Sequence, residues 1–303
     1  MASRTSFAQN LLWRLEAFGW DVAEAVLKIT PIDAASDFGG ALMRLAGPLV
    51  PTHRTVKRNL ELAFPELDEA ARRRLALDHW ESIGRTFLEF FLVPRIAADP
   101  SRIERVNFEQ LIPIALDGGP VIGISAHFAN FEIMAATLLA SGMDGHLAYR
   151  STNNPYIDAR IRKTRAAYGL RLSASKSLDG GRELIGALAQ GGTVVILTDQ
   201  KYREGPAIPF FGIPAHTQPV AVRWAMRFGV DLHTMTVRRL KGARFRVTIH
   251  EPIRIDRGGD KTTDIAANLA RVNDWVEARI REAPEQWWWV HRRFPDEYYR
   301  REG

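Results

Sequence analysis

The chain has 303 residues, of which 46% are hydrophobic and 25% are charged, and this composition is typical of a globular protein that buries a substantial core. It contains no cysteine, which excludes disulfides, thiolate nucleophiles and thiolate metal ligands. The 41 Lys and Arg outnumber the 35 Asp and Glu, and the resulting formal charge of +6 favours anionic partners such as phospholipid head groups, phosphorylated substrates or acidic carrier proteins.

The first 95 residues have the apolar periodicity of helices, with breaks at Thr30-Pro31, Gly47-Pro48 and Phe64-Pro65. Within residues 7–29, large apolar side chains recur at helical spacing, but five charged residues interrupt them. This segment is expected to form an amphipathic helix that lies in a membrane interface or packs on the domain. No stretch of about 18 uncharged apolar residues occurs, so no transmembrane helix is predicted, and no signal peptide is expected.

From residue 118 onward, short apolar runs alternate with helical segments. The runs lie at residues 121–125, 147–150, 193–198 and 230–237; the last is expected to pair with 245–255 before a final helix over 263–281. We predict an α/β fold with a central, mostly parallel mixed sheet flanked by helices. Residues 1–100 are expected to form a helical region packed on an α/β core of residues 101–303, as one continuous structural unit.

Polar side chains follow three of the predicted strands. His127 comes two residues after the first strand, Arg150 ends the second, and Asp199 and Gln200 follow the third. Open α/β sheets bind ligands outside the carboxyl ends of their strands, so a base, a cation and a carboxylate are expected to converge on one rim. The sequence therefore predicts a reaction site at this rim.

His127 and Glu132 are the candidate catalytic pair. Five residues apart on one helix would put their side chains about 140° apart, so His127 must lie in the turn before a helix and Glu132 on its first turns. In that arrangement the carboxylate accepts a hydrogen bond from one imidazole nitrogen, and the other nitrogen is free to take a proton. The competing interpretation is a histidine that caps the helix and a glutamate that neutralises it. No further ligand lies at metal-binding spacing, so no metal site is predicted.

Spacing alone does not identify this pair, because chance yields about one His-x4-acid match in a chain of this composition. A second match, His291 to Asp296, is present. The context of the two differs: His127 lies at a predicted strand-to-helix junction, whereas His291 follows a tryptophan-rich segment in a polar tail. The junction favours His127 as the functional histidine.

Several motifs together resemble one enzyme family. In chain order they are Arg58-Asn59-Leu60, Phe64-Pro65, Gly84, Glu89, His127 with Glu132, Arg150 with Asn153, Asn154 and Pro155, Asp199-Gln200, Phe210-Phe211-Gly212 with Ala215 and Thr217, and Trp289 with His291, Arg292, Arg293 and Phe294. In this ordered combination the chain resembles the lysophospholipid acyltransferase-like superfamily and, within it, the lipid A biosynthesis late acyltransferases of the lauroyl and myristoyl type. Two departures are the charges within residues 7–29, where the family commonly has an uncharged anchoring helix, and Phe131, where it often has Trp.

The resemblance implies an O-acyltransferase that moves a fatty-acyl group from an acyl carrier protein thioester to a hydroxyl of a Kdo-bearing lipid A precursor. It implies His127 as general base, Glu132 as the residue that orients it, and Arg150 as a phosphate or donor contact, which Asp199 is expected to hold. The substrate-binding positions that it implies are Arg150, Asn153, Asn154, Asp199, Gln200, Phe211, Gly212 and Thr217. No metal or organic cofactor is needed, because the thioester is already activated.

The same resemblance implies partners and a location. The partners are an acyl carrier protein, an anionic lipid acceptor and the inner-membrane surface, and no nucleic acid is expected. The protein is expected at the cytoplasmic face of the inner membrane, peripheral rather than spanning. Residues 156–168 carry four cations between apolar residues and either bind lipid phosphates or an acidic carrier or form a solvated face. The tryptophans at 287–289 suit a membrane-interface belt, with core packing of at least one as the alternative.

Three other functions stay open. The first is acyl transfer to another glycolipid or to a lysophospholipid. The second is an α/β-hydrolase with Ser125 as nucleophile, although the Gly123-x-Ser125-x-His127 sequence lacks the small residue that a nucleophile elbow needs two places after the serine. The third is a non-catalytic lipid-binding module, which leaves the polar residues at the strand ends unexplained.

Overall fold

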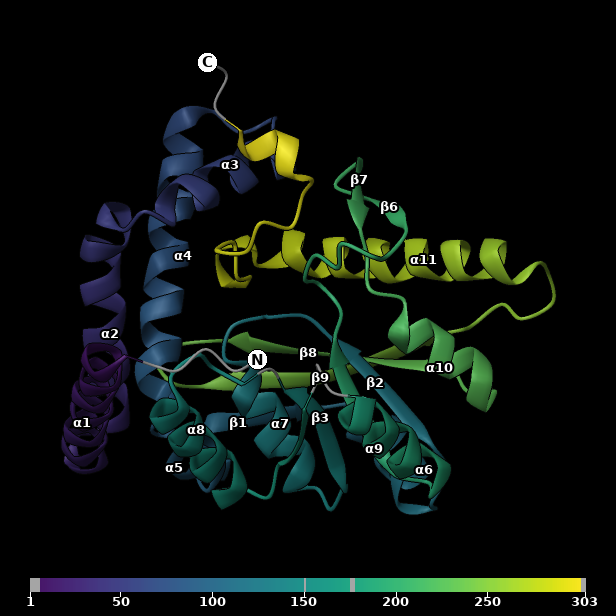
Figure 1. Ribbon diagram of the computed structural model, residues 1–303, viewed down its shortest axis with the longest axis horizontal. Coiled ribbons are helices and arrows are strands. Elements are labelled where there is room, and N and C mark those ends of the chain that lie inside the picture. The colour runs from purple at the N-terminus through teal and green to yellow at the C-terminus, as the bar shows by residue number, and fades with distance from the viewer. Residues whose placement is uncertain (1–5, 150, 175–177, 301–303) are drawn as a thin grey trace.

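The computed structural model describes residues 6–149, 151–174 and 178–300, and its centre is a seven-stranded sheet in the order β1-β9-β8-β2-β5-β3-β4. All neighbouring strands in it run parallel except β8 and β9. The strands are β1 (Ile103–Val106), β2 (Val121–Ser125), β3 (Gly145–Tyr149), β4 (Arg171–Ala174), β5 (Thr193–Leu197), β8 (Leu232–Arg239) and β9 (Phe245–Ile253), and a separate hairpin contains β6 (Ala207–Phe210) and β7 (Ile213–His216). The predicted α/β fold with a mostly parallel mixed sheet is confirmed (Figure 1).

The helices occupy the segments in which apolar residues recur at helical spacing. They are α1 (Phe7–Ile29), α2 (Ile32–Ala46), α3 (His53–Ala63), α4 (Glu69–Phe90), α5 (Val93–Ala97), α6 (Ile112–Leu116), α7 (Phe131–Leu139), α8 (Pro155–Ala167), α9 (Leu178–Ala189), α10 (Val220–Phe228) and α11 (Lys261–Glu282). Helices α1, α2 and α3 each end two residues before a proline, at Pro31, Pro48 and Pro65. Proline restricts the residue before it and cannot donate a helical hydrogen bond, so the predicted breaks are confirmed.

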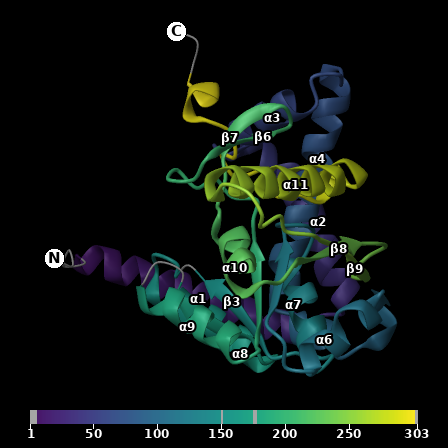
Figure 2. The same cartoon turned by 90° about the vertical axis from the view of Figure 1, so that its right-hand side faces the viewer.

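The central strands are buried on both faces because successive residues point to opposite sides of a sheet. Val121 and Val195 belong to the core cluster that contains Ile133 of α7. Ile122 and Val194 belong to the other cluster, which also contains residues of α9, α10 and α11. Figure 2 shows α9 and α10 on one side of the sheet and α7 on the other, with α11 across the top. This double burial explains why these strands are continuous apolar runs in the sequence.

The N-terminal helices stand at one end of the sheet, on the left in Figure 1. Helices α2 and α4 come into backbone contact where Gly84 faces Gly39, since a Cβ on Gly84 would overlap the Gly39 carbonyl oxygen. The close approach fixes α4, whose last turns reach the loop after β2: the Thr86 hydroxyl donates to the Ala129 carbonyl at 3.3 Å. The helical region therefore takes part in positioning that loop.

Strands β1, β4, β6 and β7 are not predicted from the sequence. Strand β1 is a half-exposed edge strand that includes Glu104 and Arg105, so it has no apolar run. The β6–β7 hairpin has four-residue strands and turns through Phe211 and Gly212, whose φ values are 49° and 72°. Short, polar or proline-containing strands lack the alternating pattern on which the prediction depends.

Candidate active site

The register of β2 and β5 brings His127 and Asp199 together. The two strands pair in parallel with Ser125 opposite Leu197, so the residues two places further along each chain leave the sheet side by side. The Nδ1 atom of His127 lies 2.8 Å from Oδ1 of Asp199. An imidazole and a carboxylate therefore meet at the carboxyl end of the sheet, the edge at which open α/β sheets bind ligands.

Asp199 is buried and held as an anion. Its Oδ2 accepts hydrogen bonds from the backbone N–H of His127 at 2.9 Å and from the indole N–H of Trp287 at 2.7 Å. Burial opposes ionisation, but the charge and hydrogen bonds of His127 outweigh it and hold the pKa of Asp199 well below its usual range. An ionised Asp199 accepts the proton on Nδ1, which leaves Nε2 of His127 with its lone pair. His127 can therefore act as a base.

The Nε2 side of His127 faces Gln200 and His291. The amide nitrogen of Gln200 lies 3.3 Å from Nε2 of His127 and 3.2 Å from Nε2 of His291. Burial, helped by the charge of His127, lowers the pKa of His291 to about 4, so this second imidazole is neutral near pH 7. Phe131 and Trp288 form an aromatic wall, with ring centroids 5.0 Å and 5.8 Å from that of His127. The Nε2 side of the base thus faces neutral groups, whereas its Nδ1 side faces the Asp199 carboxylate.

The loop that carries His127 is held by the segment after α11. The backbone N–H of Trp288 donates to the His127 carbonyl at 3.2 Å, and the N–H of Ala129 donates to the Gln286 carbonyl at 2.6 Å. Ala129 has a φ of 39°, in the left-handed region that non-glycine residues seldom adopt. The position of the imidazole therefore depends on hydrogen bonds to Gln286 and Trp288, which lie far from His127 in the sequence.

The predicted hydrogen bond between Glu132 and His127 is wrong: Glu132 bonds to other residues. Its carboxylate accepts from Nε of Arg165 at 3.1 Å and from the Tyr168 hydroxyl. Burial and the Glu132 charge raise the pKa of Tyr168 far above its usual range, so the hydroxyl stays protonated. The register of the sheet explains this: Asp199, two residues after β5, already contacts the ring of His127, and Glu132, on the first turn of α7, bonds to Arg165 of α8.

Glu132 is expected to couple energetically to Arg165 and not to Asp199. In a double-mutant cycle, Glu132→Gln and Arg165→Met together should lose less stability and turnover than the sum of the single changes, because each single change leaves a buried partner uncompensated. Glu132→Gln combined with Asp199→Asn should instead be additive within about 0.5 kcal/mol. Urea unfolding and initial rates measure both cycles. Additivity in the first cycle and coupling in the second would restore the predicted His127–Glu132 pairing.

An apolar slot lies between α7 and the strands β3 and β5. It is narrow, with a cavity volume of about 30 Å³, and its lining residues are Phe131, Glu132, Met134, Ala135, Leu138, Leu139, Met143, Gly145, His146, Leu147, Leu170, Thr193, Val195 and Leu197. One end is formed by Phe131 and Leu197, next to His127 and Asp199. The other end is formed by residues at the far end of α7, such as Leu139. Thr193 to Leu197 spans four strand steps, about 13 Å. The slot matches an extended aliphatic chain in length and polarity, and it admits such a chain only when the lining side chains move apart.

The predicted contacts after β3 lie apart from His127 or outside the described residues. Arg150 lies outside the described residues. Asn153 is exposed, and Asn154 is buried as the N-cap of α8. The amide of Asn154 donates to the Trp13 carbonyl at 3.1 Å and to the Glu16 carboxylate at 2.7 Å. Asn154 therefore joins α8 to α1, a structural contact that the family resemblance did not suggest.

The predicted contacts Phe211, Gly212 and Thr217 lie in or next to the β6–β7 hairpin. Thr217 is buried and accepts a hydrogen bond from the guanidinium of Arg293 at 2.9 Å. The N–H of Phe211 donates to the Glu277 carboxylate at 2.5 Å. In the part of the chain that the structure describes, these residues contact α11 and the C-terminal segment, and no hydrogen bond joins them to His127. Phe211 and Thr217 therefore contribute to the packing of the hairpin on α11 and the C-terminal segment.

Two tryptophans of the 287–289 run are buried, and so is Ser125. Trp287 and Trp289 have no exposed surface, and their ring centroids lie 4.5 Å apart in an edge-to-face contact. Core packing is therefore correct for two of the three tryptophans, and Trp288 forms the wall beside His127. Ser125 is fully buried and donates to the Met235 carbonyl at 2.7 Å, so it does not present a nucleophile to the site.

A carboxylate-backed imidazole beside an apolar slot is suited to general-base chemistry on a substrate with an apolar part. Residues 7–295 match the sequence profile of the family described as bacterial lipid A biosynthesis acyltransferase. The chain belongs to this family of acyltransferases, as its motifs indicate.

Three relatives illustrate the similarity. The lipid A biosynthesis lauroyltransferase of Escherichia coli is 30% identical over 254 residues, which cover 80% of this chain and 78% of the relative. The lipid A biosynthesis acyltransferase of Haemophilus influenzae is 27% identical over the same shares of both chains. The lipid A biosynthesis palmitoleoyltransferase of Escherichia coli is 24% identical over 270 residues, with 84% of this chain and 83% of the relative covered.

Proposed function

We propose that the protein transfers a fatty-acyl group from an acyl carrier protein thioester to a hydroxyl of a Kdo-bearing lipid A precursor. The observation that carries the proposal is the 2.8 Å contact between His127 and Asp199 at the head of an apolar slot, in a chain of the lipid A acyltransferase family. The names of the relatives, a lauroyltransferase and a palmitoleoyltransferase, support a fatty-acyl group. The alternative acceptors are another glycolipid and a lysophospholipid.

His127 acts as the general base in this proposal. Its Nε2 removes the proton of the acceptor hydroxyl while the hydroxyl oxygen attacks the thioester carbonyl carbon. The tetrahedral intermediate then collapses with cleavage of the C–S bond, and the departing thiolate takes the proton back from the imidazolium. Asp199 holds the tautomer and stabilises the imidazolium, the role first expected of Glu132. The amide of Gln200 lies 3.3 Å from Nε2, on the side from which the hydroxyl approaches, so the proposal requires the acceptor to displace it.

The apolar slot holds the acyl chain in this proposal, with the thioester at the Phe131 end and the methyl end toward Leu139. The bond from Arg165 to Glu132 fixes α8 against the wall of the slot. Arg150 and Asn153 remain the proposed contacts to acceptor phosphate or donor. The formal charge of +6 supports both an acidic carrier protein and an anionic acceptor.

The proposed place of action is the cytoplasmic face of the inner membrane, with the protein peripheral to the bilayer. A lipid acceptor embedded in a membrane requires the enzyme to work at that surface. Across the described ranges, no helix combines the length and apolarity needed to cross a bilayer.

The test is a reconstituted reaction. The purified chain is incubated with carrier protein loaded with acyl groups from decanoyl to palmitoyl, and with a Kdo-lipid A precursor or a lysophospholipid as acceptor. Mass spectrometry should show the precursor heavier by one acyl group, with a preferred chain length. Transfer to the lysophospholipid alone would change the acceptor class. Transfer to neither acceptor, by a folded protein that binds the loaded carrier, would contradict the proposal.

Filling the slot should shorten the preferred acyl chain. Ala135 lines the middle of the slot on α7, so Ala135→Phe should lower kcat/KM for the longest accepted donor by about 10- to 100-fold and spare the shorter ones. Ala140→Phe is the matched control, because Ala140 ends the same helix with its side chain exposed. Competition between a long-chain and a short-chain acyl donor in one reaction gives the ratio of their kcat/KM values directly. An equal loss for all chain lengths would place the acyl chain elsewhere.

A further inference from the structure

The proposed acyl transfer places a negative charge on an oxygen next to His127. When the hydroxyl oxygen bonds to the thioester carbon, the π electron pair of the C=O bond moves to the carbonyl oxygen, and the hydroxyl proton moves to Nε2 of His127. Enzymes of acyl transfer stabilise such an oxyanion with preorganised N–H groups about 3 Å away. The reaction therefore requires an N–H donor on the Nε2 side of His127.

The first backbone N–H groups of the loop after β2 are already used within the protein. Three consecutive residues donate to other groups: His127 to the Asp199 carboxylate at 2.9 Å, Phe128 to the Ala126 carbonyl at 2.7 Å and Ala129 to the Gln286 carbonyl at 2.6 Å. A substrate oxygen therefore finds no free donor among these three N–H groups. This directs attention to the side chains that face Nε2 of His127.

The side-chain amide of Gln200 is a donor at the required place. Its Nε2 lies 3.3 Å from Nε2 of His127 and 3.2 Å from Nε2 of His291. Asp199 holds the ring proton of His127 on Nδ1, so Nε2 of His127 presents a lone pair to which only the NH2 end of the amide can donate. Because an amide nitrogen carries two hydrogens, one N–H of Gln200 faces each imidazole.

His291 fixes the orientation of this amide. Burial, helped by the charge of His127, lowers the pKa of His291 to about 4, so its ring is neutral near pH 7 and Nε2 accepts one N–H of Gln200. The ring of His291 stacks on Trp288 with an interplanar angle of 23° and ring centroids 6.2 Å apart, and its backbone carbonyl accepts from the Asn59 amide at 2.7 Å. The bond to His291 thus aims the second N–H of Gln200 at the Nε2 side of His127.

We infer that Gln200 is a catalytic residue that donates a hydrogen bond to the oxyanion of the tetrahedral intermediate, and that His291 is its positioning residue. The inference rests on the proposed function and adds the charge stabilisation that a general base alone does not provide.

The amide of Gln200 can take this role because the side chain is exposed, so a substrate can reach it. The acceptor hydroxyl takes the place of the amide at Nε2 of His127, while the bond from the amide to His291 persists. The released N–H then donates to the thioester oxygen, whose charge grows as the hydroxyl attacks. When the intermediate collapses, the C=O bond re-forms, the C–S bond breaks and this hydrogen bond weakens.

Removing the donor should lower kcat and leave substrate binding unchanged. Gln200→Ala and Gln200→Glu both lack the amide N–H and should lower kcat by about 10²- to 10³-fold, with KM for the loaded carrier within about twofold of that of the parent chain. Gln190→Ala is the matched control, because Gln190 is an exposed glutamine three residues before β5, at the opposite end of that strand from Gln200. A kcat within about threefold of the parent value in both Gln200 variants would overturn the inference.

Two donor analogues separate a contact with the oxyanion from a structural role. Carrier protein with a trifluoromethyl ketone in place of the thioester forms a tetrahedral hydrate with an oxygen in the place of the oxyanion, whereas a thioether has no such oxygen. In titration calorimetry, Gln200→Ala should weaken binding of the ketone about as much as it lowers kcat/KM, and should leave binding of the thioether within about twofold. Equal losses for both analogues would mean that Gln200 shapes the site instead. Because this binding needs no acceptor, the result stands even if the acceptor class in the proposed function is wrong.

His291 should act only through Gln200. His291→Phe keeps a ring that stacks on Trp288 but removes Nε2, and it should lower kcat by about tenfold. In the Gln200→Ala background the same substitution should have no further effect, since the amide that His291 positions is gone. Equal factors in both backgrounds would show that His291 contributes independently of Gln200.

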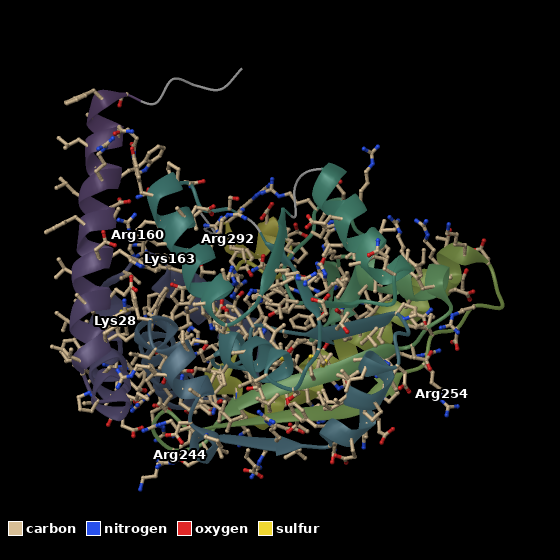
Figure 3. All side chains as sticks on the ribbon, turned by 90° about the horizontal axis from the view of Figure 1, so that it is seen from below. Lys28, Arg160, Lys163, Arg244, Arg254 and Arg292 are labelled. Atoms are coloured by element: carbon tan, nitrogen blue, oxygen red, sulfur yellow. The ribbon has the colours of Figure 1, made fainter. Side chains whose placement is uncertain are left out.

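The exposed cation Arg292 is the rival donor, because it follows His291 directly and a guanidinium can also stabilise an oxyanion. Its guanidinium carbon lies over the ring of Tyr299, 5.5 Å from the centroid, so Arg292→Gln should keep kcat within about threefold of the parent value. Arg254→Gln is the control for this change, at an exposed position far from Arg292 in Figure 3. A loss of about 10²-fold in Arg292→Gln, together with an active Gln200→Ala, would assign the oxyanion to the cation.

Discussion

Replacing Asp199 with Asn should lower kcat for acyl transfer by about 10²- to 10⁴-fold in a protein that stays folded. The Asn amide donates to Nδ1 of His127, which moves the ring proton to Nε2, so the nitrogen that faces the acceptor has no lone pair. The Asn carbonyl oxygen still accepts from the backbone of His127 and from Trp287, as Oδ2 of Asp199 does at 2.9 Å and 2.7 Å. The loop therefore keeps its place while the base is lost.

Initial rates with a loaded carrier protein and a lipid A precursor measure this loss. His127→Ala should lose a similar factor, and the double variant should lose no more than either single one, because the two residues act as a unit. Asp117→Asn is the matched control, since Asp117 is an exposed carboxylate four residues before β2. Wild-type kcat in Asp199→Asn, with activity lost in His127→Ala, would remove Asp199 from the mechanism.

Replacing Glu89 with Ala should lower the free energy of unfolding by about 3 to 5 kcal/mol. Glu89 is fully buried on α4 and accepts from Nη2 of Arg239 at 2.8 Å, from the Ser36 hydroxyl at 2.7 Å and from the Asn130 amide at 3.1 Å. The substitution leaves the Arg239 guanidinium, whose side chain is only 8% exposed, without its counter-charge. Urea unfolding measures the loss, read from the midpoint at constant m-value.

A surface pair provides the control for this stability change. Arg246 and Glu104 are 2.9 Å apart with exposed side-chain fractions of 43% and 47%, so Glu104→Ala should stay within about 1 kcal/mol of the parent chain. The double variant Glu89→Leu with Arg239→Met replaces both buried charges with apolar side chains. It should recover most of the lost stability, because the loss in Glu89→Ala comes from the unpaired buried charge of Arg239. A loss below about 1 kcal/mol in Glu89→Ala would mean that Arg239 finds another partner or solvent.

Asn130 links this pair to the catalytic loop. Its amide donates to Glu89, and Asn130 is the residue before α7. A chain that loses Glu89 is therefore expected to hold His127 less firmly, and its activity should fall more steeply on warming than its fraction folded. The helical region thus contributes to the site through α4, although none of its residues provides the base.

The carboxyl-end rim could be located from the sequence because apolar runs and their polar followers are local signals. Val121–Ser125 and Thr193–Leu197 are read directly from residue types, and a parallel sheet places the residues after them on one edge. His127 and Asp199 each lie two residues beyond the end of their strand. On neighbouring parallel strands, this equal offset predicts that the two side chains meet.

The local sequence pattern does not predict whether Asp199 or Glu132 is the partner of the His127 imidazole. Sequence proximity favours Glu132, but which carboxylate meets the ring depends on strand order, on register and on the turn of the loop at Ala129, all of which are long-range properties. Arg165 and Tyr168, the partners of Glu132, carry no signal of their own, because a cation on a basic amphipathic helix is usually solvated.

The sequence by itself determined the α/β class, the helical N-terminal region, the family and the rim that holds His127, because hydrophobic periodicity and ordered motifs act over a few residues at a time. The tertiary structure alone decided which acid holds the imidazole, that Trp287 and Trp289 belong to the core, and that the apolar face of α1 points outward. The physical reason is common to all three: a side chain's partner and its exposure are set by whatever distant segment packs against it, and that packing is a property of the whole fold.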